Sequence, residues 1–76
     1  MGRFKTERDR SRRTVAYELG EEVMGYYYED KSDPGVFPIY IWFGDAGDFE
    51  LTDVVTDEKE AKALLSSWNW PVVRQK

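Results

Sequence analysis

The chain has 76 residues and a formal net charge of −4, which allows one small domain. It contains no cysteine and no histidine, so disulfides and thiolate metal sites are excluded, and the usual general base and commonest metal ligand are missing. No apolar run approaches the ~18 residues of a membrane span, and the N-terminus lacks the apolar stretch of a signal peptide. We therefore expect a cytoplasmic protein without membrane contact, since a cysteine-free chain fits that compartment.

The charges are unevenly distributed along the chain. Residues 14–70 hold thirteen carboxylates against three lysines. Residues 1–13 contain two acidic side chains and show no hydrophobic period. Their six basic side chains are Arg3, Lys5, Arg8, Arg10, Arg12 and Arg13. We predict that residues 1–13 form a flexible basic N-terminal arm and that residues 14–76 form a single compact domain.

Four stretches have the alternation, or the β-branched and aromatic content, that is typical of strands. They cover residues 14–19, 22–29, 35–45 and 49–55. Gly20 and Glu21 suit a two-residue type II′ turn, and the two later connections are rich in turn-forming residues. Pairing the stretches in order predicts a four-stranded antiparallel meander.

The register of these strands assigns their faces. With a turn at Gly20 and Glu21, Tyr17 lies opposite Met24, and each residue on that face meets an apolar residue or a tyrosine on the next strand. A slip by one residue would destroy this agreement. The predicted core face consists of Val15, Tyr17, Leu19, Met24, Tyr26, Tyr28, Phe37, Ile39, Ile41, Phe43, Phe49 and Leu51.

Residues 56–68 predict one α-helix. Ala61, Leu64, Leu65 and Trp68 form an apolar stripe at helical spacing, and Asp57 suits the N-cap. Laid on the core face of the sheet, this helix gives a two-layer α+β fold. Residues 71–74 offer a short fifth strand at the C-terminus.

The second face of the sheet is also aromatic, although no second helix is predicted to cover it. The same register places Val23, Tyr27, Tyr40 and Trp42 near its centre, and Glu18 and Glu50 at its margins. Exposed tyrosine and tryptophan within a polar rim are typical of a binding patch. We interpret these six residues as the partner-binding site.

Three uses of this face stay open. In the first, it binds another protein with a basic surface; in a sharper form, the acidic body imitates nucleic acid and inhibits a nucleic-acid-handling protein. Small acidic α+β proteins of this kind resemble the inhibitors that phages and plasmids encode. In the second, the basic arm and the sheet aromatics bind single-stranded nucleic acid. In the third, the face is covered by the chain's own ends, with Trp70 and Val72 as candidates, or by a second copy, so the chain is a monomer or a homodimer.

Catalysis is not expected from this composition. Without histidine or cysteine, a base that titrates near neutral pH would have to be a buried carboxylate. Two loops carry clusters, Asp30 with Asp33 and Asp45 with Asp48 and Glu50, and turn formation explains both. We therefore expect no catalytic residue, no metal site and no cofactor.

Overall fold

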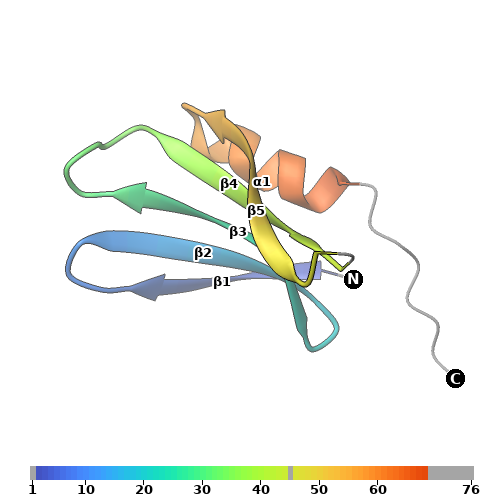
Figure 1. Cartoon of the computed structure of the whole chain (residues 1–76). Helices are drawn as coiled ribbons and strands as arrows, with labels where there is room; N and C mark the ends of the chain where they lie inside the picture. Colours follow the sequence, from blue (N-terminus) through green and yellow to red (C-terminus); the bar gives the residue numbers. More distant parts are fainter. Residues whose placement is uncertain (1, 45, 69–76) are drawn as a thin grey trace, which may run out of the picture.

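The structure, a computed structural model that describes residues 2–44 and 46–68, is a five-stranded antiparallel sheet with one helix packed on it (Figure 1). The strand order is β1-β2-β3-β4-β5, so neighbouring strands are consecutive in sequence. The elements are β1 (Gly2–Arg8), β2 (Arg12–Leu19), β3 (Glu22–Asp30), β4 (Phe37–Phe43), β5 (Asp48–Val55) and α1 (Glu58–Ser67). The predicted α+β class and the antiparallel meander are confirmed.

The N-terminal residues form an edge strand where the sequence predicted a flexible arm. All of β1 pairs with β2, from Gly2 opposite Leu19 to Arg8 near the hairpin loop. The ring of Phe4 packs on Tyr17, with ring centroids 5.0 Å apart. The prediction was wrong here because charged side chains on both faces of an edge strand hide its alternation. β1 therefore brings the described sheet from the four predicted strands to five. The predicted C-terminal strand, residues 71–74, lies outside the described residues.

A β-bulge in β3 shifts the register by one residue and exchanges the faces of this strand. Tyr17 lies opposite Gly25 rather than Met24, which becomes the extra residue of the bulge. The middle residue of the tyrosine triplet 26–28 therefore enters the core, and the outer two lie on the opposite face. The sequence prediction for all three tyrosines was wrong, because one inserted residue reverses every side chain beyond it.

A second register shift, between β4 and β5, makes their pairing differ from the predicted one. Thr52 is the extra residue, because Leu51 and Asp53 pair with consecutive residues of β4. Phe49 and Leu51 therefore leave the predicted core face, and the side chain of Leu51 is 56% exposed. Phe43, at the end of β4, is 37% exposed instead of being part of the core.

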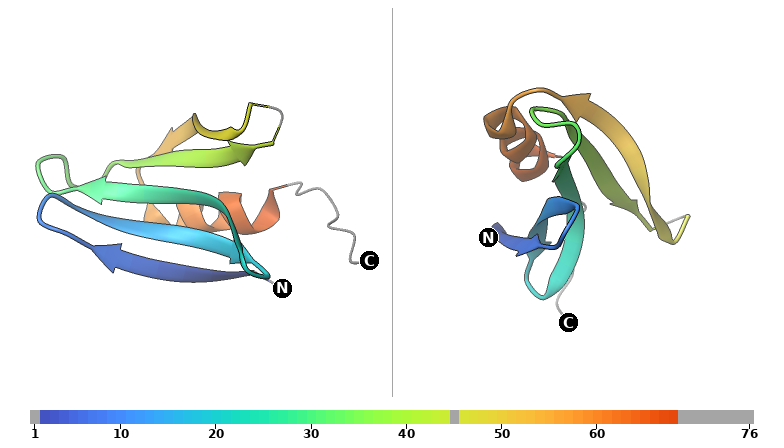
Figure 2. Two further views of the ribbon diagram at one scale, coloured as in Figure 1. Left: turned by 60° about the horizontal axis from the view of Figure 1, so that its bottom comes forward. Right: turned by 90° about the vertical axis from the view of Figure 1, so that its left-hand side faces the viewer.

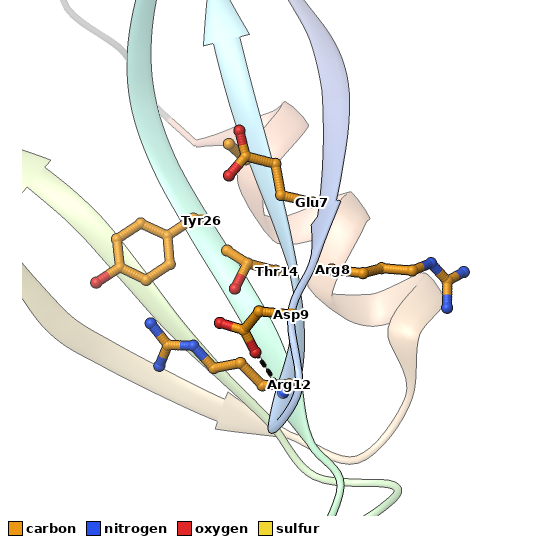
Figure 3. A pocket seen from close by; sticks show the side chains of 7 residues that line it. Glu7, Arg8, Asp9, Arg12, Thr14 and Tyr26 are labelled. Carbon is orange, nitrogen blue, oxygen red and sulfur yellow. Dashed lines mark hydrogen bonds between the residues drawn. The ribbon is translucent and has the colours of Figure 1, made fainter.

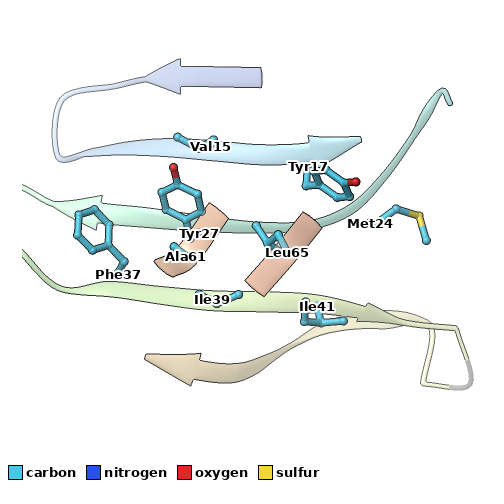
Figure 4. Close-up of a cluster of buried hydrophobic side chains, with 9 residues drawn as sticks. All are labelled: Val15, Tyr17, Met24, Tyr27, Phe37, Ile39, Ile41, Ala61 and Leu65. Carbon is cyan, nitrogen blue, oxygen red and sulfur yellow. The ribbon is translucent and has the colours of Figure 1, made fainter. Parts of the chain in front are cut away.

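Helix α1 covers one side of the twisted sheet (Figure 2), which we call the helix face; the opposite side, which carries no described helix, is the open face. Asp57 is the N-cap, as predicted, and accepts a hydrogen bond from the Lys59 N–H at 3.1 Å. The predicted apolar stripe is confirmed: Ala61 and Leu65 are buried, and Leu64 and Trp68 pack beside them. Figure 4 shows the core, which consists of Val15, Tyr17, Met24, Tyr27, Phe37, Ile39, Ile41, Ala61 and Leu65.

Gly25 sets the distance between the helix and the sheet. A Cβ atom at this position would lie 2.7 Å from the carbonyl oxygen of Tyr40 and 2.8 Å from Cδ2 of Leu65. Both contacts are shorter than packed atoms tolerate, so only glycine lets Leu65 approach the bulge this closely. Within residues 2–44 and 46–68, no helix has the length and apolar character needed to cross a membrane.

Candidate partner-binding face

The open face carries a continuous row of five rings, which we call the aromatic row. Strand β3 contributes two tyrosines, β4 a tyrosine and a tryptophan, and β5 a phenylalanine. The register brings them together, because Tyr26 lies opposite Tyr40 and Trp42 lies opposite Phe49. The members of the row are Tyr26, Tyr28, Tyr40, Trp42 and Phe49.

The three tyrosines of the row stack on one another. The ring of Tyr40 lies 5.0 Å from that of Tyr26 at an interplanar angle of 13°, and 6.0 Å from that of Tyr28 at 19°. Phe49 meets Tyr26 and Trp42 edge to face, with centroids 5.2 Å and 5.0 Å apart. Such pairs add about 0.5–1.5 kcal/mol each beyond the area they bury, so the row is a rigid surface.

Arg12 continues the stack at the end of the sheet. Its guanidinium carbon lies 4.3 Å from the centroid of the Tyr28 ring, a cation–π contact. Hydrogen bonding with Tyr40, together with burial, raises the pKa of the Tyr28 hydroxyl. Burial and the neighbouring Tyr40 raise the pKa of Tyr26 as well. Tyr26 and Tyr28 therefore stay neutral at physiological pH.

Two shallow hollows flank the aromatic row, and both contain carboxylates. The first, of about 330 Å³, lies on the β1–β2 side (Figure 3), where the Arg12 side chain extends beside Asp9 and Arg8 points away. It is lined by Glu7, Arg8, Asp9, Arg12, Thr14, Ala16 and Tyr26. The second, of about 170 Å³, is lined by Tyr28, Asp30, Ser32, Asp33, Val36 and Pro38.

The structure brings some of the predicted partner-binding residues to this face and removes others. Tyr40, Trp42 and Val23 lie on the open face, as the sequence indicated. Tyr27 is fully buried on the helix face, because the bulge in β3 reverses it. Glu50 pairs with a core residue of β4 and so lies on the helix side of its strand.

Glu18 stays at the margin of the open face, where Arg3 of β1 reaches it. The Nε atom of Arg3 donates to Oε1 of Glu18 at 3.2 Å. Because the Arg3 side chain is largely exposed, we expect this pair to contribute little to stability. The pairing nevertheless occupies one predicted partner-binding carboxylate and one predicted nucleic-acid-binding arginine.

Sequence reasoning missed three members of the aromatic row, namely Tyr26, Tyr28 and Phe49. All three were assigned to the core, because the predicted register contained no bulge. The isolated glycine in β3 was the available signal, since a glycine inside a strand pattern often marks a bulge or a close backbone approach. No comparable signal marks the shift at Thr52 in β5.

Arg13, predicted as part of a nucleic-acid-binding arm, lies on the helix face in a polar cluster. Its guanidinium donates two bonds of 2.9 Å to the carboxylate of Glu58 and one of 3.3 Å to Glu29. The hydroxyl of Tyr27 donates to the same Glu58 carboxylate at 2.6 Å. The cluster ties the first turn of α1 to β2 and β3, so its function is structural.

The pKa values in this cluster are shifted by these contacts. The bonds from Arg13, and then that from Tyr27, lower the pKa of Glu58 to about 2. Burial raises the pKa of Tyr27, and the Glu58 carboxylate raises it further. Hydrogen bonds to Glu58 raise the pKa of Arg13. All three groups therefore keep one protonation state across the neutral range.

Among the residues that the structure describes, no group of three or more acidic side chains is arranged to hold a metal ion. Comparison of the chain with protein families, with curated proteins and with solved structures found no match.

Proposed function

We propose that the chain is a non-enzymatic protein-binding module that docks through its open face on a protein with a basic surface. The observation that carries this proposal is the aromatic row, five rings held rigidly on a sheet face without a described helix. Rigid tyrosine and tryptophan side chains anchor protein interfaces because they bury a large area at low entropic cost. The cytoplasm is the proposed location.

The charge around the row favours a basic partner. The second hollow is lined by two carboxylates and no basic side chain, the first by two carboxylates and two arginines, and residues 14–70 carry thirteen acidic side chains against three lysines. Opposite charges raise the rate of encounter and exclude partners of the wrong sign. Inhibition of a nucleic-acid-handling protein is the concrete form that we propose, because such proteins carry basic surfaces that recognise rows of negative charge.

Single-stranded nucleic acid is a less suitable partner for this face. Bases stack on exposed ring faces, whereas the face of Tyr28 meets Arg12 and that of Tyr40 meets two other tyrosines. A base would have to displace one of these neighbours. The predicted basic arm is also dispersed: Arg13 bonds to the helix and Arg3 bonds to Glu18.

Affinity capture followed by measurement with the purified partner tests the proposal. We expect the Tyr40→Ala/Trp42→Ala variant to bind the captured partner at least ~100-fold more weakly, because central interface aromatics each contribute 2 kcal/mol or more. The matched control is Lys59→Ala/Glu60→Ala, which changes two exposed side chains on α1. Thermal unfolding verifies that both variants fold.

Three results would overturn the proposal. The first is equal binding of the partner by wild type and the open-face variant. The second is a concentration-dependent dimer that Tyr40→Ala/Trp42→Ala dissociates, which would show that a second copy covers the face. The third is binding of a single-stranded oligonucleotide at 50 mM NaCl that the same variant abolishes.

A further inference from the structure

The two edges of the sheet differ in how their backbone groups are protected. β1 and β5 are the edge strands, and an edge strand presents unpaired N–H and C=O groups to any chain that can pair with them. Natural proteins usually block such edges with bulges, charges or a covering segment.

The β5 edge is blocked by side chains of β5 itself. The carboxylate of Asp48 accepts the N–H of Phe49 at 2.8 Å, and that of Asp53 accepts the N–H of Val54 at the same distance. These groups are therefore occupied, and the register shift at Thr52 bends the strand out of line.

The β1 edge has neither a register shift nor side-chain bonds to its outward backbone groups in the part of the chain that the structure describes. Its pairing with β2 runs without a register shift, and Asp9 donates its N–H to the carbonyl of Arg12 at 3.0 Å. Because bonded and non-bonded pairs alternate in an antiparallel ladder, the backbone groups of Phe4, Thr6 and Arg8 point away from β2. Among the described residues, no side chain donates to or accepts from these groups.

The side chains around this edge are mainly basic. Arg3 and Lys5 lie on the open face beside Glu7, which is the one acidic residue of β1, and Arg8 lies on the other side of the strand. On the helix face, Nζ of Lys62 lies 5.5 Å from the ring centroid of Phe4. We propose that β1 accepts an extended acidic segment of a partner protein as a sixth strand, with main-chain bonds supplying affinity and these cations selecting the charge. This proposal does not depend on the aromatic row.

A pair of synthetic peptides tests the proposal. One is an eight-residue capped peptide in which Glu alternates with Val, and in the other Lys replaces Glu. In an NMR titration with amide hydrogen exchange, we expect the Glu peptide to protect the N–H groups of Phe4, Thr6 and Arg8. The N–H groups of Lys5 and Glu7, which already face β2, should change little. The Lys peptide should bind at least ~10-fold more weakly.

Two variants separate the backbone contribution from the charge. Thr6→Pro removes an outward N–H without removing a bond to β2, and it should abolish binding of the Glu peptide. Lys5→Glu/Arg8→Glu should weaken that binding about tenfold even if the proline variant fails to fold. The matched control, Lys31→Glu/Lys59→Glu, makes the same change in net charge away from β1 and should retain binding.

The following results would overturn the proposal. The proposal is wrong if the three outward amides stay unprotected at millimolar Glu peptide, or if the two peptides bind equally. Protection of the same amides that rises with protein concentration alone would assign the edge to a second copy of the chain. Loss of binding in Tyr40→Ala/Trp42→Ala but not in Thr6→Pro would assign the peptide to the aromatic row.

Discussion

Glu58 connects more of the structure than any other described carboxylate. It receives bonds from Arg13 of β2 and Tyr27 of β3 at the first residue of α1. A negative charge at this position is also favoured by the helix dipole. Because the carboxylate is partly exposed, we expect solvent to reduce its contribution below what its pKa alone implies.

The first prediction concerns the pH dependence of stability. The pKa of Glu58 is about 2 in the folded state and near its ordinary value of 4.5 in the unfolded state, so the unfolded state binds more protons in acid. The contribution of this group is therefore fully present above pH 4.5 and is lost as the pH falls toward 2. Glu58→Gln should lower the free energy of unfolding by about 1–2 kcal/mol at pH 7 and flatten its decline between pH 5 and 2.

Urea unfolding at pH 7, 5, 3 and 2.5 measures this effect. The control is Glu60→Gln, which removes an exposed carboxylate two residues further along α1. Curves of equal slope for wild type and Glu58→Gln between pH 5 and 2 would contradict the assignment.

Neither partner of this ion pair could be predicted from the sequence. Glu58 has Lys62 at i+4, which predicts a solvated pair on the helix surface, and Arg13 stands in a run of charges that resembles a mobile arm. The two residues are 45 positions apart, and only the docking of α1 on the sheet brings them together. Local patterns carry no information about a contact of this kind.

At the scale of the elements, the sequence predicted where the strands and the helix lie but not how the strands align. Alternation and turn residues located β2–β5, and the stripe from Ala61 to Trp68 located α1. The two bulges were not predicted, because an unbulged register also gave an apolar face with matched neighbours. β1 was missed for a different reason, since an edge strand with charged side chains on both faces has no hydrophobic period.

The second prediction concerns the β5 edge. Asp48→Ala/Asp53→Ala frees the N–H groups of Phe49 and Val54, so this variant should self-associate more strongly than the wild type. Asp48→Asn/Asp53→Asn is the control, because asparagine removes the charge but keeps an oxygen acceptor. Sedimentation velocity at several concentrations compares them. Equal association of the alanine and asparagine variants would show that charge, rather than the side-chain bonds, protects this edge.

The whole molecule has two chemically different sides. The helix face is closed by α1 and by the Arg13–Glu58 cluster, and the open face carries the aromatic row between hollows lined by carboxylates. The position of the open face followed from the sequence, because one helix covers one side of a sheet. The residues of this face were predicted only in part. Tyr40 and Trp42 were predicted correctly, whereas Tyr27 is buried and its neighbours Tyr26 and Tyr28 lie on the open face.

The third prediction applies to the charge of the whole chain. If the acidic body guides a basic partner to the open face, the association rate should fall at least about tenfold between 20 and 300 mM NaCl, and the dissociation rate should change much less. Tyr40→Ala/Trp42→Ala should show the reverse pattern, with a faster dissociation rate and the same salt dependence. Stopped-flow measurements with the captured partner decide this, and an association rate independent of salt would contradict it.

The glycine beneath Leu65 has a consequence for which surface a partner encounters. Two alignments of the same strands both give a sheet side rich in tyrosine: the observed one buries the middle tyrosine of the triplet, and the unbulged one would bury the outer two. Only the observed alignment points position 25 at the helix, where a Cβ atom has no room. A larger residue at 25 fits only the unbulged alignment, so the smallest side chain in β3 decides which tyrosines the molecule shows to the outside.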